Sequence, residues 1–305
     1  MKYLIKIGIF SLLLGLTGYF LILRQRTQNT VVDSNKLSVY ASIYPLTFFA
    51  QEIGGDKVLV TTITPPGVEP HEYDPNPGDL ANIYKAKLLI LNGANMEPWA
   101  DKAKADIESK GIHVVTSSDG IDLLRKDGQP DPHFWLDPVS AQRIVLNIMN
   151  GLIKIDPVNE SYFRANADKL IVKLINLDNQ FRQSLFNCEQ NTVIASHSVF
   201  GYLEKRYKFK QDTLAGLSPD EEPSSQRIAE IVATIKQKNI KYVLTETLLS
   251  PKLAETLSRE TGVIVQVFNP LESLSQGDLD KGENYFTIQE TNRQILVAAL
   301  QCTTN

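Results

Sequence analysis

The sequence predicts an α/β protein of two lobes, each a mainly parallel sheet flanked by helices, joined by one long rigid helix. Short runs rich in β-branched and aliphatic residues alternate with amphipathic stretches in both halves of the chain, a pattern typical of parallel sheets covered on both faces. Between the halves lies an amphipathic run at 159–186 without glycine or proline. At 305 residues, the chain is long enough for two lobes with sizeable cores.

The first lobe is placed at residues 37–155. Its segment 88–91 is wholly apolar, as expected of a strand buried on both faces of a parallel sheet, and Gly54-Gly55 suits the left-handed end of a helix. The expected strands are 37–43, 58–64, 88–91 and 112–115, and the expected helices are 46–53, 79–85, 99–110 and 140–153.

The linking helix is placed at residues 156–186. Apolar residues recur there at steps of three and four, which puts them on one face of a helix. They are Phe163, Ala167, Leu170, Leu174, Leu177, Phe181 and Leu185. A helix over 159–186 is roughly 40 Å long at 1.5 Å per residue, enough to run along two lobes. A single apolar face of this length fits a helix that packs against the two lobes of the same chain better than a coiled coil.

The second lobe is placed at residues 187–305 and repeats the plan of the first. Its expected strands are 192–196, 242–245 and 263–268, and its expected helices are 224–238, 251–260 and 285–300. The chain has two cysteines, Cys188 and Cys302. In an oxidising compartment they would form one disulfide, and otherwise they are two unpaired small side chains; the sequence favours neither.

The N-terminus predicts export. Lys2 and Lys6 flank the start of an uncharged apolar run at 7–23, the pattern of an export signal. The run is also close to the shortest membrane span. No cysteine follows it, which excludes a lipid anchor of the lipoprotein type. Residues 1–26 are therefore interpreted as a signal or an N-terminal membrane anchor, and 27–36 as a polar linker.

The composition excludes two broad classes. Hydrophobic residues make up 43% of the chain, charged residues 22%, and the formal net charge is −4. There is no basic excess of the kind that nucleic-acid-binding proteins carry. There is also no low-complexity or highly charged stretch that would predict extensive disorder.

Three of the four histidines stand in loops, beside prolines or at the end of a predicted strand. They are His71 in Glu69-Pro-His-Glu-Tyr-Asp-Pro75, His133 in Asp131-Pro-His-Phe-Trp-Leu-Asp-Pro138 and His197 in Ala195-Ser-His-Ser198. Proline stiffens the backbone, which suits a metal ligand because coordination tolerates little positional error. The fourth, His113, lies inside an apolar strand and is interpreted as structural.

Ligand sites of parallel sheets form outside the carboxyl ends of the strands. His71, His197, Glu246 and the turn 269–272 all fall at or just after such ends. Three imidazoles and one oxygen ligand suit tetrahedral zinc. A hydrolytic zinc site is disfavoured because no His-Glu-x-x-His motif is present. The prediction is a protein that captures a metal and is not an enzyme.

Five ordered motifs resemble the solute-binding proteins of ABC importers for zinc and manganese, the cluster A-I (cluster 9) family. The resemblance runs from about Val39 to Leu300. Its motifs are Pro70-His-Glu-Tyr-Asp-Pro-Asn-Pro77, Asp131-Pro-His-Phe-Trp-Leu-Asp-Pro138, Ser196-His-Ser-Val-Phe-Gly-Tyr202, Leu217-Ser-Pro-Asp-Glu-Glu-Pro223, and Thr245-Glu246 with Ser250-Pro-Lys-Leu-Ala-Glu255.

The resemblance implies a metal site between the lobes. His71, His133 and His197 fall on three ligand positions of the family, and histidine at the third position resembles the zinc members, whereas manganese members typically carry glutamate there. Many relatives have an aspartate after the last strand, where this chain has Asn269 followed by Pro-Leu-Glu272. Glu272 is the preferred fourth ligand, with the Asn269 oxygen or a water as fallback. The histidine-rich loop of many zinc members is absent between residues 117 and 131.

The resemblance also implies partners and location. A monomer would carry Zn²⁺, and less readily Mn²⁺, to an ABC permease in the membrane. It would act in the periplasm, free or held at the outer face of the inner membrane by its N-terminal helix. The alternative is a cell-surface adhesin, because the same fold also occurs in surface binding proteins.

Overall fold

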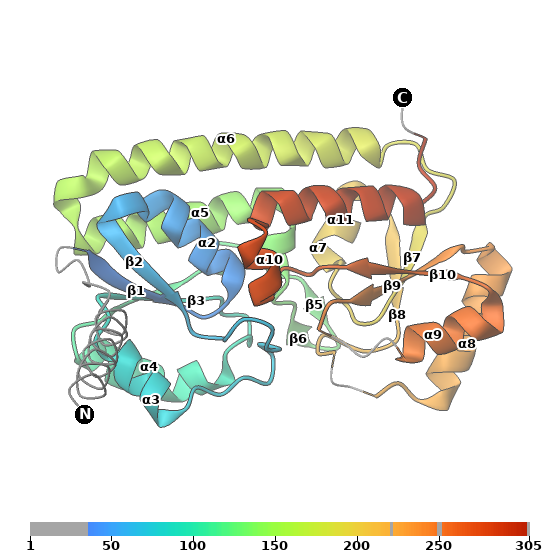
Figure 1. Cartoon of the computed structure of the whole chain (residues 1–305), viewed down its shortest axis with the longest axis horizontal. Coiled ribbons are helices and arrows are strands. Elements are labelled where there is room, and N and C mark those ends of the chain that lie inside the picture. The colour runs from blue at the N-terminus through green and yellow to red at the C-terminus, as the bar shows by residue number, and fades with distance from the viewer. Residues whose placement is uncertain (1–35, 220–221, 249–251, 304–305) are drawn as a thin grey trace, which may run out of the picture. The chain divides into compact units, whose positions relative to one another are not determined.

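The computed structural model describes residues 36–219, 222–248 and 252–303 and contains two four-stranded sheets whose strands all pair in parallel (Figure 1). The first has the order β2-β1-β3-β4, with β1 Leu37–Ala41, β2 Val58–Thr62, β3 Leu88–Leu91 and β4 His113–Thr116. The second has the order β10-β9-β7-β8, with β7 Thr192–Ala195, β8 Lys210–Thr213, β9 Tyr242–Glu246 and β10 Ile264–Phe268. The predicted fold class is confirmed.

Helices cover both faces of each sheet. In the first half they are α2 Tyr44–Gly54, α3 Pro77–Ile83, α4 Pro98–Ser109, α5 Pro138–Ile155 and α6 Glu160–Ser184. In the second half they are α7 Gly201–Tyr207, α8 Ser225–Lys238, α9 Lys252–Thr261, α10 Gln276–Asp280 and α11 Tyr285–Ala299. Three short 3-10 turns lie at Gly55–Lys57, Phe134–Leu136 and Pro157–Asn159, and a small hairpin joins β5 Arg125–Lys126 to β6 Gln129–Pro130.

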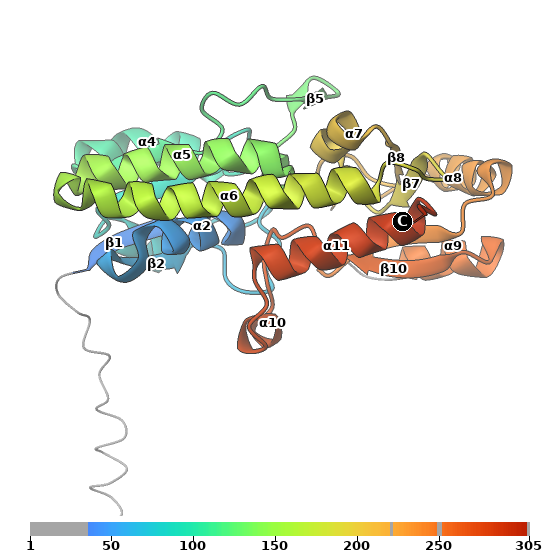
Figure 2. The same cartoon turned by 90° about the horizontal axis from the view of Figure 1, so that it is seen from above.

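One continuous hydrophobic core joins the two halves along α6. Helix α6 has 25 residues, about 37 Å at 1.5 Å per residue, and lies along α5 with α11 beside its later part (Figure 2). The predicted apolar stripe of α6, from Phe163 to Leu185, is buried and packs with residues of both sheets. The opposite faces have separate small cores, formed with α3 and α4 in the first half and with α8 and α9 in the second.

Four features were not predicted from the sequence: α7, β8, α10 and the β5–β6 hairpin. Helix α7 is only seven residues long, too short for helical periodicity to stand out. Strand β8, Lys-Gln-Asp-Thr, is polar and carries little strand propensity. It is held at the sheet edge by its pairing with β7, from Thr192 opposite Lys210 to Ala195 opposite Thr213. The hairpin has only two residues per strand.

The predicted signal or anchor at 1–26 and almost all of the predicted linker at 27–36 lie outside the described residues. Within the part of the chain that the structure describes, no helix is long and apolar enough to cross a membrane.

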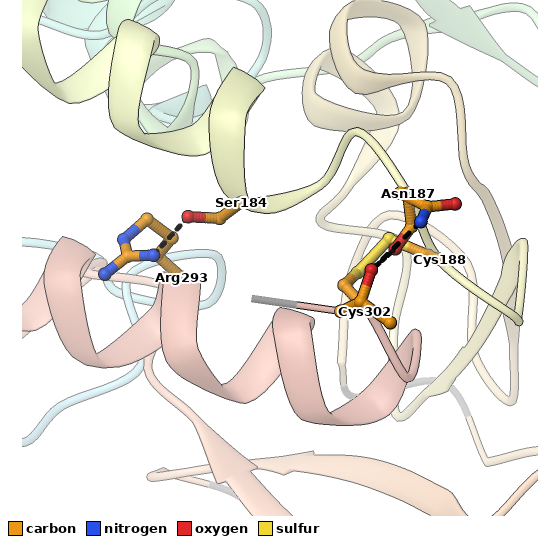
Figure 3. Close-up of a disulfide and its surroundings, with 6 residues drawn as sticks. Ser184, Asn187, Cys188, Arg293 and Cys302 are labelled. Carbon is orange, nitrogen blue, oxygen red and sulfur yellow. Dashed lines mark hydrogen bonds between the residues drawn. A yellow bond between two sulfur atoms is a disulfide. The ribbon is translucent and has the colours of Figure 1, made fainter. Parts of the chain in front are cut away.

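A disulfide joins Cys188, just after α6, to Cys302, just after α11 (Figure 3). The same junction is held by hydrogen bonds from the Asn187 side-chain amide to the Thr303 hydroxyl, 3.0 Å, and from the Thr303 backbone N–H to the Asn187 carbonyl, 2.9 Å. The bond therefore ties the end of the chain to the linking helix, and of the two cysteine states that the sequence left open, the structure has the disulfide.

We expect Cys302→Ser to lower the free energy of unfolding of the metal-free protein by about 4 kcal/mol, because the bridge closes a loop of 114 residues and restricts the unfolded chain. Denaturant unfolding of the variant, with chemically reduced wild type as the matched control, measures this loss. Equal stability of the oxidised and reduced proteins would contradict the prediction.

Candidate metal centre

The candidate site lies where residues beyond the carboxyl ends of both sheets meet. In each sheet the strand order reverses once, between β1 and β3 in the first and between β7 and β9 in the second. Such reversal points open a crevice for a ligand. His71 follows β2, His197 follows β7 and Glu272 follows β10, whereas His133 lies in the loop that leads into α5.

The four predicted ligands form one cluster. His71, His133, His197 and Glu272 each offer one ligand atom, and these atoms all lie within 4.8 Å of one another. The Nε2 atom of His133 lies 3.2 Å from that of His71 and 3.4 Å from that of His197. The Oε1 atom of Glu272 lies 3.3 Å from Nε2 of His133, 3.5 Å from that of His71 and 3.7 Å from that of His197.

These separations match a tetrahedral shell. For zinc bonded to nitrogen at about 2.0–2.1 Å, the edge of a regular tetrahedron is about 3.4 Å. His133, His197 and Glu272 are 0–1% exposed. Among the described residues, neither carboxylate oxygen of Glu272 has a hydrogen-bond partner. A buried carboxylate without a hydrogen bond is costly, and a cation at the centre of the cluster would coordinate it.

His133 is oriented by Asp131. One oxygen of Asp131 accepts hydrogen bonds from both the His133 backbone N–H, at 3.0 Å, and the His133 ring Nδ1, at 2.8 Å. The ring therefore turns its Nε2 atom toward the cluster. Beyond it, Asp137 caps α5 by accepting from the backbone N–H groups of residues 139 and 140, so the Asp-Pro steps on both sides of His133 have a structural role.

His197 is oriented in the same way by Glu246, from the end of β9. The His197 Nδ1 atom lies 2.6 Å from Oε1 of Glu246, and the Ser196 hydroxyl donates to the same oxygen. A carboxylate that accepts from one ring nitrogen fixes the tautomer and directs the other nitrogen to a metal. The strand that carries Glu246 pairs directly with the strand that precedes His197.

His71 is the most accessible of the four, with its side chain 10% exposed. Glu69 holds its loop by accepting a hydrogen bond from the His71 backbone N–H, 3.2 Å. Asn269, the fallback ligand, has its side-chain oxygen bonded to the Leu271 backbone N–H at 2.8 Å. That bond closes a tight turn in which Leu271 has φ +63°, and the turn places Glu272 against the imidazoles.

The electrostatics of the site are dominated by burial and by the carboxylates beside the imidazoles. Burial lowers the pKa of His197, but the Glu246 and Glu272 carboxylates outweigh it and raise this pKa to about 10. Burial also lowers the pKa of His133, and Asp131 and Glu272 raise it above its ordinary value. For His71 burial prevails, and its pKa is lowered.

Glu272 has the opposite response. Burial raises the pKa of its carboxyl, but the three adjacent imidazoles outweigh burial and hold this pKa well below its usual range. Nearby, burial and the Glu272 charge raise the pKa of Glu69 to about 8. The metal-free site is therefore a carboxylate among partly protonated imidazoles.

Sequence reasoning did not assign Asp131 and Glu246 their roles as orienting carboxylates. A signal for Asp131 was its position two residues before a histidine, across a proline. For Glu246 the signal was its place at the end of a predicted strand, as for His197. His113, which the sequence analysis set aside, begins β4 and lies opposite Leu88.

A two-lobed α/β fold with a buried cluster of three imidazoles and one carboxylate between the sheets defines a metal-binding solute-binding protein. The chain belongs to the ZnuA family, "Zinc-uptake complex component A periplasmic", whose model matches residues 39–299. The family resemblance seen in the sequence is thus confirmed. Transport components make up the family, and its description places it outside the cytoplasm.

Individual relatives agree. The high-affinity zinc uptake system protein ZnuA of Bacillus subtilis is 37% identical, over 87% of this chain and 88% of its own length. The zinc-binding lipoprotein AdcA of Streptococcus pneumoniae is 34% identical over 93% of this chain, and the match spans only 59% of AdcA.

Two solved structures share the fold. The Zn(II)-bound ZnuA-like domain of S. pneumoniae AdcA has a TM-score of 0.79 and 36% identity, covering 87% of this chain and 99% of that one. The laminin-binding protein of Streptococcus agalactiae has a TM-score of 0.81 and 29% identity with the same coverage, and is described as having adhesin and metal-transporting activity.

Proposed function

We propose that the protein captures Zn²⁺ with His71, His133, His197 and Glu272 and delivers it to an ABC permease. The observation that supports this most is the spacing of the four ligand atoms: five of their six pairs lie 3.2–3.7 Å apart, and all lie within 4.8 Å of one another. Three nitrogens and one oxygen at tetrahedral spacing suit zinc, whereas Mn²⁺ is better served by more oxygen ligands in an octahedral shell.

Glu272 is the fourth ligand in this proposal. Its two carboxylate oxygens have no hydrogen-bond partner among the described residues, whereas the Asn269 oxygen already accepts from Leu271. A carboxylate also binds a dication more strongly than a neutral amide does.

Zinc titration of the metal-stripped chain from about residue 36, by calorimetry in competition with manganese, tests the function. One-to-one binding with zinc preferred over manganese is the expected result. A protein that binds manganese more tightly would be a manganese carrier, and one that binds neither metal would overturn the proposal.

We further infer where the protein acts. The basic residues and apolar run within 1–26 support export with this segment as a signal or a membrane anchor. The loaded protein would dock on the permease as a monomer. Fractionation of cells that express the full chain distinguishes release from anchoring, since an anchored protein stays with the membrane.

A second candidate function is adhesion. It is favoured by one observation, the likeness to the laminin-binding protein of S. agalactiae. Binding of immobilised laminin by the zinc-loaded and zinc-free protein tests it, with serum albumin as the control surface. Laminin binding above that control would add this function, and its absence would leave metal capture alone.

Zinc binding is expected to release protons. At pH 7 His197, with a pKa of about 10, is protonated in the metal-free protein, and the raised pKa of His133 favours the same state. A metal needs the Nε2 lone pair, so each proton there must leave. Because protons compete with the metal below these pKa values, the apparent zinc affinity should rise with pH, with about one to two protons released per metal near neutral pH.

Calorimetry at one pH in two buffers of different ionisation enthalpy measures this proton release. The Glu246→Gln variant is the matched comparison, because it removes a charge that raises the pKa of His197 and should release fewer protons. Identical heats in both buffers for the wild type would contradict the prediction.

A further inference from the structure

The turn that carries Glu272 leaves the second sheet but is hydrogen-bonded mainly to the first lobe. After β10 ends at Phe268, residues 269–273 reach the cluster. Three donors of the first lobe bond to this turn, and each belongs to a different segment. They are the Trp135 indole N–H to the Pro270 carbonyl, 2.8 Å, the Gly67 N–H to the Ser273 hydroxyl oxygen, 2.9 Å, and the Tyr44 N–H to the Glu272 carbonyl, 3.4 Å.

Trp135 joins the turn to the loop of His133. Its side chain is fully buried, its ring centroid lies 5.3 Å from that of His133, and its indole bonds to Pro270. Its own carbonyl accepts from the Tyr285 hydroxyl at 2.6 Å. The Trp135 side chain thus connects the His133 loop to the Glu272 turn. Trp135 is not itself one of the four ligands.

Ser273 joins the turn to the loop of His71. Its hydroxyl accepts from the Gly67 N–H and donates to the Pro65 carbonyl at 3.4 Å, and the residue is 5% exposed. Pro65 and Gly67 lie in the loop between β2 and α3 that presents His71. The residue next to Glu272 therefore fixes the spacing between Glu272 and the His71 loop.

In the described part of the chain, the hydrogen bonds from the second lobe to this turn lie at its start. The Asn292 side chain, from α11, donates to the Asn269 carbonyl at 2.6 Å and accepts from the Asn269 N–H at 3.1 Å. His197 differs, because its ring is oriented by Glu246 and its neighbour Ser198 donates to the Gly216 carbonyl at 2.7 Å, all within the second half.

We propose that Trp135 and Ser273 are positioning residues that fix Glu272 on the first lobe, so that His71, His133 and Glu272 form a preorganised three-ligand half-site. His197 is then the one ligand that the second lobe supplies. The inference rests on the proposed zinc function and goes beyond it. Glu272 belongs to the second lobe by sequence, but the first lobe positions it. Ligands held by such second contacts need no rearrangement when the metal arrives.

The test is a double-mutant cycle between Trp135→Phe and Glu272→Ala, read as the zinc dissociation constant by competition with a chromophoric chelator. Phenylalanine keeps an aromatic ring and removes the indole N–H. We expect Trp135→Phe alone to raise the dissociation constant about tenfold, the scale typical of outer contacts. In the Glu272→Ala background the same change should have almost no effect, because it acts through Glu272.

Two controls separate positioning from general damage. Trp99→Phe changes the only other tryptophan, in α4, and should leave zinc affinity unchanged. Ser273→Ala removes a hydroxyl with little change in volume and should reproduce the loss if Trp135→Phe does not fold. Co²⁺ absorption adds a signature, since a displaced carboxylate alters the visible bands of a tetrahedral site, whereas lost stability alone does not.

Each outcome is decisive. A tenfold loss that disappears in the Glu272→Ala background supports the proposal. An unchanged dissociation constant in Trp135→Phe and in Ser273→Ala, or an equal loss with and without Glu272, overturns it while leaving zinc capture intact. A wild-type protein that binds no zinc overturns the proposed function itself, which the same titration shows before any variant is made.

Discussion

Replacing His133 by alanine is expected to weaken zinc binding by about 10²–10³-fold. Four-ligand zinc sites are worth roughly 10–16 kcal/mol, so one ligand contributes about 3–4 kcal/mol, which is 10²–10³ in affinity. His133 has the shortest contacts with the other three ligands, 3.2–3.4 Å, and is fully buried. Because His133 is more deeply buried than His71, a water molecule should replace its imidazole less readily.

The matched control is His113→Ala, which changes the only histidine outside the cluster. His113 lies in β4 and does not belong to the cluster of ligand atoms, so its removal should leave zinc affinity unchanged. Equal affinity of His133→Ala and wild type, measured by chelator competition, would contradict the assignment. Far-ultraviolet circular dichroism of the metal-free variant checks that the fold is kept.

Much of the fold was predictable because its strands are short apolar runs and its long helix has one regular stripe. The segment 88–91 is buried along its whole length, as its composition predicts, and the stripe of α6 is buried from Phe163 to Phe181. One strand that was not predicted, β8, forms because of strand pairing and not because of its composition. Strand β8 is polar, and it is a strand because β7 offers it an edge.

The candidate ligands were predictable for a related reason. His71 and His197 follow apolar strands, and the carboxyl ends of parallel strands converge on one edge of a sheet. The choice between Asn269 and Glu272 was not predictable from the residues alone. It depends on the left-handed backbone of Leu271, on the Asn269 side chain that closes the turn, and on one hydrogen bond from Trp135, a residue far away in the sequence.

Glu272→Gln is expected to weaken zinc binding by about 10²–10³-fold at pH 8, again roughly the contribution of one ligand. Glutamine keeps the shape of the side chain but removes the charge that lies 3.3–3.7 Å from the three imidazoles. The Glu272 charge also raises the pKa values of His133 and His197. Those values should therefore fall in the variant, and fewer protons should compete with zinc.

The two effects of Glu272→Gln oppose each other as the pH falls. The lost metal–carboxylate attraction lowers affinity at every pH, whereas the weaker proton competition raises it only where the wild-type imidazoles are protonated. The difference between variant and wild type should therefore be smaller at about pH 6 than at about pH 8. Glu69→Gln is the control, because Glu69 lies near Glu272 but bonds to the His71 backbone N–H and not to the metal-facing nitrogens. A pH-independent loss in Glu272→Gln would mean that Glu272 acts as a ligand without setting the protonation of its neighbours.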